Sequence, residues 1–561
     1  MLKNKVYTMT SDMKNLIEQP AWLALSQHYQ DTAAKHMRDA FADESNRFER
    51  FSVKHGEILL DYSRNRITDL TMRLLVDLAE SVDLQAKIAG LFAGNPVNTT
   101  EQRPALHTAL RDSSGHPVFI NNENITAQVA DSQTHLFQFA ADIHTGKRCG
   151  ITGKPFQHIV NIGIGGSYLG SKMCAEALQD FAVSPLSFHF LSTVDPDHLR
   201  DVLHQVDPET TLFIISSKSF STLETITNAR AVTKWLVDKL GAKAPLIHTA
   251  AVTACKEKAA ALGVADDSIF TFWDWVGGRY SIWSAIGLPL ILMIGAKQFS
   301  EFLLGAHEID HHFQEAPFKH NIPVILALLS IWYSNFFNTA TQAIVPYSHR
   351  LRFLVPYIQQ VEMESSGKSA TLNGDRVAYT TGSVIFGEEG CNGQHSFHQM
   401  LHQGQHLIPV DFILIAKPQH HTGQAHQDLL LASALSQAYT LVHGRTAKEV
   451  QHDLKATALS SLQAEILSQH LIMDGNKPSN LMLLDRLNPK NLGALLALYE
   501  HKIFVQSAIW NINPFDQWGV ESGKKTLPVI LAQMENREHE TVLDAATVSL
   551  IDHFKKIKGQ S

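Results

Sequence analysis

The sequence predicts an α/β protein with two doubly wound layers of parallel strands, preceded and followed by mainly helical segments. From about residue 155, short apolar runs lead into glycine- or serine-rich turns and then amphipathic helices, and a second region of this kind begins at residue 382. Strands that alternate with helices in this way are typical of parallel sheets with crossover helices. The chain length of 561 residues agrees, because it exceeds what one hydrophobic core usually serves.

Each layer is predicted from a change of pattern, in which an apolar strand gives way to a turn and then to helical periodicity. In the first layer we expect strands at 158–162 and 211–215, turns at 163–166 and 216–221, and helices at 168–178 and 222–240. In the second layer we expect a strand at 382–386, a helix at 394–405 and a strand at 407–416.

Helical segments flank and join the two layers. Residues 1 to about 125 are mostly helical in pattern, because Leu70, Leu74 and Leu78 recur at helical spacing. A helical stretch near 290–320 joins the layers, and the chain is helical again from about 430, with its clearest break at 476–480. The longest apolar run, 322–333, is shorter than the roughly 20 residues that span a membrane, so we expect a buried core helix.

Composition narrows the classes of partner. The net charge is −8, and no basic block or basic stripe is present, so neither nucleic acid nor a membrane is expected as a partner. The four cysteines are scattered without a Cys-x-x-Cys pair, and the first residues lack the apolar core of a signal peptide. We therefore expect reduced thiols in a cytoplasmic protein.

Two glycine-containing loops resemble nucleotide-binding motifs only in part. The loop at 163–167 follows a strand, but the dinucleotide fingerprint needs glycine or alanine where this chain has Tyr168. Gly367-Lys368-Ser369 ends like a phosphate-binding P-loop, yet Glu362 stands where that motif requires glycine. Neither loop predicts a nucleotide site.

A hydroxyl-rich loop, Ser217 to Thr222, is a candidate site for a single phosphate group. It lies at a strand-to-helix turn, where backbone N–H groups and the helix dipole favour an anion, and four hydroxyl groups add neutral donors. A Ser/Thr-rich helix N-cap has the same local composition, so the loop alone leaves both interpretations open.

Glu364 is a candidate catalytic base. It stands in a short polar turn that follows the apolar, aromatic run 353–358, so a carboxylate is presented where the chain leaves a buried segment. A base that removes a proton from carbon belongs in such a place, because partial desolvation raises the proton affinity of a carboxylate. The alternative is a solvated glutamate at the end of an element.

Three motifs resemble the phosphoglucose isomerase (glucose-6-phosphate isomerase) family. They are Gln360-x-x-Met-Glu364-Ser-x-Gly-Lys368, Val276-Gly-Gly-Arg-Tyr-Ser-Ile-Trp-Ser-Ala-Ile-Gly287 and Phe515-Asp-Gln-Trp-Gly-Val-Glu-Ser-Gly-Lys524. Shorter similarities at 92–111, 161–167, 391–395 and 499–506 extend the resemblance over nearly the whole chain. The family implies two sugar-isomerase-type α/β domains and reversible isomerisation of glucose 6-phosphate and fructose 6-phosphate in glycolysis and gluconeogenesis.

The resemblance also implies roles for single residues. Glu364 would carry the proton, Arg279 would stabilise the enediol oxygens, and His395 and Lys524 would share ring opening. The substrate-binding residues would be Gly166, Ser167, Ser217, Lys218, Ser219, Thr222, Glu224, Gly278, Gln360 and Gln517. In isolation, the alternative for Arg279 is a structural salt bridge that anchors a turn.

The family further implies an organisation and a partner. We expect a helical segment at 1–125 that packs on the second domain, a first α/β domain at 126–290 that binds the sugar phosphate, a second at 291–515 with the catalytic glutamate, and a C-terminal motif and helical arm at 516–561. The family works as a cytoplasmic homodimer with a shared active site, to which His395 of the other subunit would contribute. No metal or organic cofactor is expected.

Several alternatives stay open. His395, His398, His402 and His406 fall at spacings of three, four and four on a predicted helix, so a zinc site is conceivable, although no His-Glu-x-x-His pattern is present. Cys391, where the family usually has threonine, is either a packed residue or a reactive thiol. A non-catalytic sugar-phosphate regulator on the same fold, or an isomerase of another hexose phosphate, is the alternative function.

Overall fold

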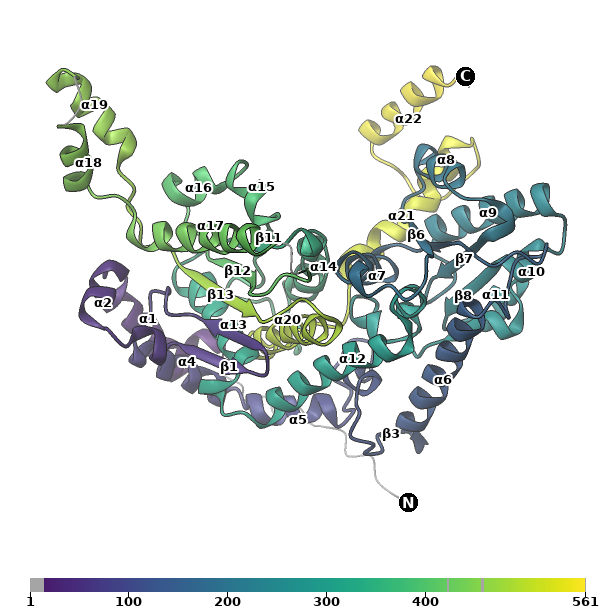
Figure 1. Cartoon of the computed structure of the whole chain (residues 1–561), viewed down its shortest axis with the longest axis horizontal. Helices are drawn as coiled ribbons and strands as arrows, with labels where there is room; N and C mark the ends of the chain where they lie inside the picture. Colours follow the sequence, from purple (N-terminus) through teal and green to yellow (C-terminus); the bar gives the residue numbers. More distant parts are fainter. Residues whose placement is uncertain (1–14, 421–422, 456–458, 560–561) are drawn as a thin grey trace. The chain divides into compact units, whose positions relative to one another are not determined.

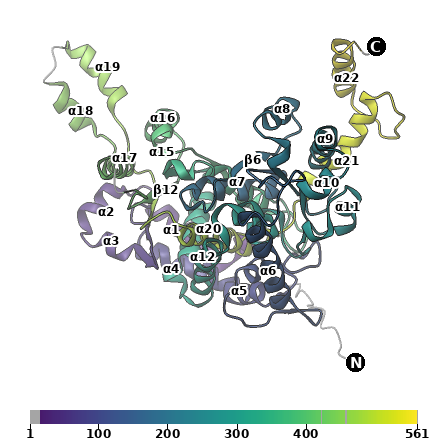
Figure 2. The same ribbon diagram turned by 45° about the vertical axis from the view of Figure 1, so that its right-hand side comes forward.

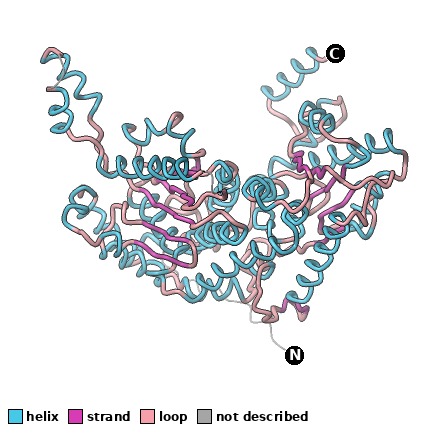
Figure 3. The backbone as a smooth tube through the Cα atoms, in the orientation of Figure 1, coloured by secondary structure: helices cyan, strands magenta, loops and turns pink. Residues whose placement is uncertain are grey.

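The computed structural model describes residues 15–420, 423–455 and 459–559. The chain forms two compact units, residues 1–514 and residues 515–561. The second unit holds the helices α21 (Trp518–Met534) and α22 (Ala545–Ile557). The first unit holds two large sheets, drawn as separate groups of magenta strands in Figure 3.

The helices of the first unit cover these sheets (Figure 1). Their bounds are α1 Pro20–Thr32, α2 Met37–Asp43, α3 Arg47–Arg50, α4 Asp69–Ser81, α5 Leu84–Phe92, α6 Ile125–His144, α7 Leu169–Ala177, α8 Pro196–His204, α9 Leu223–Leu240, α10 Ala244–His248, α11 Lys256–Ala261, α12 Leu288–Glu315, α13 Ile322–Ile331, α14 Leu354–Ser366, α15 Gly390–Gln394, α16 His398–Gln403, α17 Gln424–His443, α18 Ala447–Leu454, α19 Ser461–Leu471 and α20 Pro489–Ile509.

The first sheet is parallel throughout and has the order β6-β5-β7-β8-β9. Its strands are β5 (His158–Ile162), β6 (Ser187–Leu191), β7 (Thr211–Ser216), β8 (Thr249–Thr253) and β9 (Ile269–Thr271). Every residue of β7 and β8 is buried, as is typical of parallel strands covered by helices on both faces. The strands predicted at 158–162 and 211–215 are confirmed.

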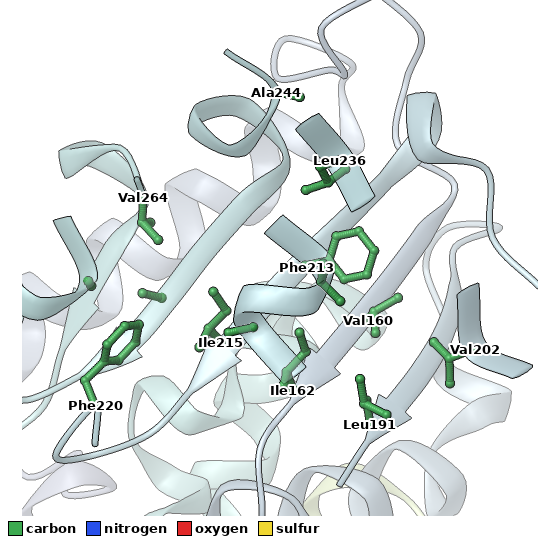
Figure 4. Packing of buried hydrophobic residues seen from close by; sticks show 14 of the residues in the cluster. Val160, Ile162, Leu191, Val202, Phe213, Ile215, Phe220, Leu236, Ala244 and Val264 are labelled. Atoms are coloured by element: carbon green, nitrogen blue, oxygen red, sulfur yellow. The ribbon is translucent and has the colours of Figure 1, made fainter. Parts of the chain in front are cut away.

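One hydrophobic core lies between this sheet and the helices packed on one of its faces (Figure 4). Phe213 and Ile215 of β7 point into it, and Val202 of α8 and Leu236 of α9 close it from the helical side. Burying each large side chain stabilises the fold by about 1.5–3 kcal/mol relative to leaving it in water. This core fixes where β5 and β7 end, and therefore where their loops begin.

The second sheet has the order β1-β2-β13-β12-β10-β11. Its strands are β1 (Ser52–His55), β2 (Ile58–Asp61), β10 (Thr341–Tyr347), β11 (Val384–Phe386), β12 (Val410–Ile415) and β13 (Ser479–Leu484). The strands β10 to β13 pair in parallel, whereas β2 runs antiparallel to β13. The predicted class, parallel sheets with crossover helices and helical extensions, is confirmed.

Two parts of this sheet lie in segments whose sequence pattern is helical. The mostly helical N-terminal segment contains the hairpin β1–β2, and the C-terminal helical region contains β13. The hairpin strands have only four residues each, and β2 is completed by Leu481 to Leu484, more than 400 residues away in sequence. Such pairing depends on tertiary contacts that a local pattern does not encode.

The pair α12 and α20 forms the helical centre of the first unit. Of the described helices, α12 belongs to a segment, Ala285–Glu315, that is long and apolar enough to span a membrane, but two thirds of its most apolar window is buried inside the protein. The predicted helix at 322–333 is α13, and every residue of α13 is buried. Both segments are therefore core helices.

Glycines allow α12 and α20 to approach each other closely. A Cβ atom on Gly493 would lie 1.9 Å from the carbonyl oxygen of Phe302, and one on Gly305 would lie 1.8 Å from that of Lys490. No side chain fits at these positions unless the helix axes move apart.

We predict that Gly493→Ala destabilises the first unit by about 1–3 kcal/mol, the usual cost of overpacking, despite the higher helix propensity of alanine. Denaturant unfolding measures the change. Gly519→Ala is the control, because it places the same methyl group on helix α21 in open space. Equal stability of Gly493→Ala and wild type would show that the helix pair is not closely packed there.

Candidate functional site

The candidate site begins at the carboxyl ends of β5 and β7. In the first sheet, β5 is the first strand in sequence and lies between the second, β6, and the third, β7. The connections from β5 and β7 therefore leave in opposite directions, and ligands of open α/β sheets bind at such a switch point. The loops that follow these two strands are the glycine loop 163–167 and the hydroxyl loop 217–222.

Hydrogen bonds between the two strand ends hold these loops in register. Asn161, at 1% exposure, donates from Nδ2 to the carbonyl oxygen of Ser167 at 3.1 Å, and its Oδ1 accepts from Ser216 Oγ at 2.8 Å. One buried amide thus connects the glycine loop to the start of the hydroxyl loop. The two loops keep a fixed spacing as a result.

The hydroxyl loop turns tightly before helix α9. Ser217 Oγ lies 3.3 Å from Thr222 Oγ1, and Ser221 Oγ donates to Ser219 Oγ at 2.8 Å. Phe220 adopts a positive φ of 47° and buries its ring in the hydrophobic core below. Thr222 is the N-cap residue of α9, yet its side chain makes no capping hydrogen bond. This geometry favours the anion site over the plain N-cap.

Lys218 connects the hydroxyl loop to the arginine loop, residues 272–279, which follows strand β9. Its ammonium group donates to the carbonyl oxygens of Asp274 at 2.7 Å and Val276 at 2.9 Å, just before Gly277-Gly278-Arg279. Burial, together with the charge of Arg103, lowers the pKa of Lys218 to about 8. The side chain therefore braces the two loops, and its role as a substrate ligand stays a prediction.

Gly166 and Gly278 bring the glycine loop against the arginine loop. A Cβ atom on Gly166 would lie 2.1 Å from the carbonyl oxygen of Gly278 and 2.8 Å from the backbone nitrogen of Arg279. Backbone therefore packs directly on backbone at this point. The neighbouring Gly165 has a φ of +58°, and a Cβ there would lie 3.2 Å from Gln360 Nε2. Glycine at 166 is required by space.

Arg279 is a buried cation in the 3₁₀ helix Gly278–Trp283, with a side chain that is 1% exposed. Its Nε donates to Ser365 Oγ at 2.7 Å and its Nη2 donates to the carbonyl oxygen of Pro514 at 2.5 Å. Its Nη1 lies 3.3 Å from Glu364 Oε2. Arg279 therefore forms a salt bridge, and its partner is the candidate base Glu364, so the structural and the catalytic interpretations apply together.

Glu364 lies in the last turn of helix α14, and not in a polar turn as the sequence suggests. The helix continues to Ser366 because Val361 and Ser365 face the core while Glu364 faces outward with 21% of its side chain exposed. Gln360 lies one helical turn earlier and donates from Nε2 to Glu364 Oε2 at 3.2 Å. The carboxylate is thus held from two sides and still reaches solvent.

His395 is the C-cap residue of helix α15 and is exposed. Among the described residues, no hydrogen bond or ion pair joins it to Glu364 or Arg279.

The predicted helix across the four histidines is split, since α15 ends at Gln394 and α16 begins at His398. His398 and His402 both contact Gln437 Oε1, and no metal-binding group of three or more ligands occurs in the part of the chain that the structure describes.

Cys391 packs at the edge of the core of the second sheet. Burial, followed by the charge of Glu389, raises the pKa of its thiol. A raised pKa lowers the thiolate fraction and hence the reactivity. The structure therefore favours the packed residue over the reactive thiol.

Glu224 is half-buried in the first turn of α9, next to the hydroxyl loop. Gln517 and Lys524 belong to the second unit, where Gln517 precedes α21 and Lys524 pairs with Glu521 at 2.9 Å on the helix surface. The first unit alone therefore brings together the glycine, hydroxyl and arginine loops with Gln360 and Glu364. The roles of Gln517 and Lys524 stay predictions.

Two residues of this site escaped the sequence reasoning. Ser365 and Tyr280 contact each other through Ser365 Oγ and the phenol oxygen at 2.9 Å, and Ser365 also contacts Arg279. Each directly follows a residue singled out for chemistry, Glu364 or Arg279, which is the one signal that could have found them.

Taken together, the first sheet with its loops and helix α14 define an α/β protein that has a candidate anion site beside a carboxylate–guanidinium pair. Such a site suits a phosphorylated substrate from which a proton is moved. Comparison with known proteins gives the family. The family model described as phosphoglucose isomerase matches residues 61–551, so the chain belongs to the phosphoglucose isomerase family, as the motifs predict.

Individual relatives agree with this assignment. The glucose-6-phosphate isomerase of Shewanella oneidensis is 46% identical over 547 residues, which cover 97% of this chain and 100% of that protein. The glucose-6-phosphate isomerase of Chlorobium phaeobacteroides is 47% identical over 542 residues, or 96% of this chain and 97% of that protein. The crystal structure of a glucose-6-phosphate isomerase from Chlamydia trachomatis superposes with a TM-score of 0.84 at 28% identity, covering 97% of this chain and 100% of that chain.

We predict that Gly166→Ala lowers isomerase activity by at least about 100-fold, because the new methyl group must separate the glycine loop from Arg279. Coupled-enzyme kinetics on fructose 6-phosphate measure the loss. Gly423→Ala is the control, since its φ of −165° is extended backbone and the nearest atom to the new methyl group, the carbonyl oxygen of His420, would lie 3.9 Å away. Wild-type activity in Gly166→Ala would show that the two loops need no close backbone approach.

Proposed function

We propose that this site interconverts D-glucose 6-phosphate and D-fructose 6-phosphate by ring opening and proton transfer through a cis-enediol intermediate. The observation that carries the proposal is the approach of Arg279 Nη1 to Glu364 Oε2 at 3.3 Å beside the glycine loop. The relatives named above share the assignment along nearly the whole chain. The activity belongs to glycolysis and gluconeogenesis.

Glu364 acts as the base. In the open-chain aldose, its carboxylate removes the proton from C2, the bonding electrons form the C1=C2 double bond, and the aldehyde oxygen O1 takes up the negative charge. The proton of the O2 hydroxyl passes to O1, so the negative charge of the enediol moves to O2. The same carboxyl group then returns the proton to C1 and gives the ketose. One base serves both carbons because a cis-enediol presents them on the same side. The partial exposure of Glu364, at 21%, leaves its carboxylate open to a substrate.

Arg279 stabilises the negative charge that develops on the oxygens of the enediol. A guanidinium group stays charged at every working pH, and its side chain is almost fully excluded from solvent here. A fixed charge in such a place stabilises a transition state more than the same charge in water. The ion pair with Glu364 is the resting arrangement, into which the substrate inserts.

The phosphate group is held by the hydroxyl loop and the N-terminus of helix α9. The hydroxyl groups of Ser167, Ser217, Ser219 and Thr222 are donors around an uncapped helix end. Lys218 acts mainly by bracing this loop against the arginine loop. Gly166, Gly278, Glu224 and Gln360 line the rest of the site, and the family motif assigns Gln517 to substrate binding as well.

Ring opening is assigned to His395 and Lys524, which would exchange protons with the ring oxygen and the anomeric hydroxyl. Imidazole and ammonium groups are both able to move protons near neutral pH. The exposure of His395 supports a role in a neighbouring subunit, because the side chain has no catalytic partner among the described residues of its own chain.

A homodimer with a shared active site fits the surface of the first unit. Figure 1 and Figure 2 both show α18 and α19 extending beyond α17. Large apolar side chains are exposed along α17 and α19, namely Leu429, Leu435, Tyr439, Leu462 and Ile466. In the second unit, Leu550 and Ile557 are exposed on α22. Leu435 and Tyr439 on α17, like Leu462 and Ile466 on α19, lie one helical turn apart, and exposed apolar side chains that adjoin in this way are typical of interaction surfaces.

The reaction needs no metal or organic cofactor, because one carboxylate and one guanidinium suffice for proton transfer through an enediol. The four cysteines are free thiols, which suits a cytoplasmic protein. A non-catalytic sugar-phosphate regulator is disfavoured, since it would have no use for the pairing of Glu364 with Arg279. An isomerase of another hexose phosphate is disfavoured by the names of the relatives.

We predict that Glu364→Gln lowers kcat for fructose 6-phosphate by at least about 1,000-fold, because the amide keeps the shape of the side chain but accepts no proton from carbon. A dehydrogenase that reports glucose 6-phosphate measures turnover, with EDTA present throughout. Binding of the sugar phosphate should persist. Glu257→Gln on the exposed surface of α11 is the matched control.

Two results would contradict this proposal. Undiminished turnover in Glu364→Gln would mean that another group carries the proton. Wild-type protein that binds the sugar phosphate without converting it would favour the regulator, and loss of activity on chelation would favour a metal-dependent reaction.

A further inference from the structure

Ser365 contacts the side chains of two consecutive residues, Arg279 and Tyr280. Its Oγ accepts a hydrogen bond from Arg279 Nε at 2.7 Å and lies 2.9 Å from the phenol oxygen of Tyr280. Ser365 is fully buried, and Tyr280 is 2% exposed. Solvent therefore offers the serine hydroxyl no competing partner, and its hydrogen bonds are directed wholly by these two side chains.

The guanidinium of Arg279 is planar, so contacts at two of its nitrogens fix the direction of the third. Nε donates to Ser365 and Nη2 donates to the carbonyl oxygen of Pro514, which leaves Nη1 directed at the carboxylate of Glu364. Ser365 follows Glu364 directly on helix α14. One helix thus supplies both the base and the group that aims the cation at it.

Tyr280 anchors the other side of this contact. Its ring stacks on His107 with 4.7 Å between the ring centroids, and the imidazole of His107 lies 4.0 Å from Glu500 Oε2. Glu500 is held in turn by Arg111 at 2.6 Å, with both side chains fully buried. The phenol is therefore fixed by a buried network that reaches the central helix α20.

We propose that Ser365 is a positioning residue, which with Tyr280 orients the guanidinium of Arg279 toward the developing charge of the enediol. This inference rests on the function proposed above. In this proposal Ser365 does not contact the substrate and transfers no proton, because the serine acts only through Arg279. Removing the Ser365 hydroxyl should therefore weaken those interactions of Arg279 that form only when the sugar carries negative charge near C1 and C2.

Ser366 provides a matched control within the same turn of α14. It is also fully buried, but its Oγ donates to the carbonyl oxygen of Glu362 in its own helix. Replacing either serine with alanine removes one buried hydroxyl and keeps the helix propensity high. Only Ser365→Ala removes a contact to Arg279.

The experiment measures kcat, KM and the affinity for two inhibitors in both variants. One inhibitor is a five-carbon aldonic acid phosphate, whose carboxylate places negative charge where the enediol oxygens form. The other is a hexitol 6-phosphate, an uncharged polyol apart from its phosphate. For Ser365→Ala we expect kcat to fall about 10- to 100-fold, the size of one charge-assisted hydrogen bond, with KM changed less than about threefold.

The inhibitors separate positioning from general damage. In Ser365→Ala the Kd of the aldonic acid phosphate should rise about as much as kcat falls, while the Kd of the hexitol phosphate stays near its wild-type value. Tyr280→Phe should shift the same quantities in the same direction by less, and it should add little in the Ser365→Ala background. Ser366→Ala should match wild type in all four.

Three outcomes would overturn the inference: an unchanged kcat in Ser365→Ala, an equal loss of affinity for both inhibitors, or the same losses in Ser366→Ala. If Ser365→Ala does not fold, the Tyr280→Phe variant decides by the same pair of affinities. Failure of the proposed function looks different, because wild-type protein would then show no turnover or no preference for the charged inhibitor.

Discussion

The ion pair between Arg279 and Glu364 is the contact on which the rest of the site depends. The arginine stands in a loop that follows the first sheet, and the glutamate ends a helix that follows β10 of the second sheet. Burying a guanidinium group destabilises the fold unless the group is paired and hydrogen-bonded, so the groups around Arg279 must accept its hydrogen bonds. The chain provides these groups through Ser365 and the carbonyl oxygen of Pro514.

This requirement explains the local sequence around the pair. Gly166 lacks a side chain because the glycine loop meets the backbone of the arginine loop directly at Gly278 and Arg279. Lys218 extends the same construction to the hydroxyl loop, through two carbonyl oxygens that precede Gly277. A phosphate held by the hydroxyl loop would therefore have a fixed place relative to the cation and the base.

Much of this could be predicted from the sequence. The strands β5 and β7 are apolar runs that end in turns rich in glycine or serine, so local pattern suffices for them. The hairpin β1–β2 and strand β13 were missed, because each is short and stable only against a distant partner. Glu364 was expected in a turn, because polar residues follow the apolar run that ends at residue 358, but helix α14 continues to Ser366, two residues beyond Glu364.

The sequence motifs identified the residues proposed for the chemistry, but not the residues that position them. Glu364 and Arg279 stand in stretches specific enough to indicate their family, whereas Ser365 and Tyr280 are ordinary residue types whose importance lies only in what they touch. Contacts between segments some 85 residues apart have no local signature. The fully buried pair of Lys502 and Glu362, at 2.8 Å, escaped notice for the same reason, although it fixes α14 on α20.

The most direct test of the account is isomerisation in heavy water, because the central claim is that a carboxylate moves a proton through an enediol. During repeated turnover, a proton on Glu364 exchanges with solvent, so deuterium should accumulate at C2 of glucose 6-phosphate and at C1 of fructose 6-phosphate. Mass spectrometry and NMR measure it. Full equilibration of the two sugars without any deuterium on carbon would show direct hydride transfer and would contradict the role of Glu364.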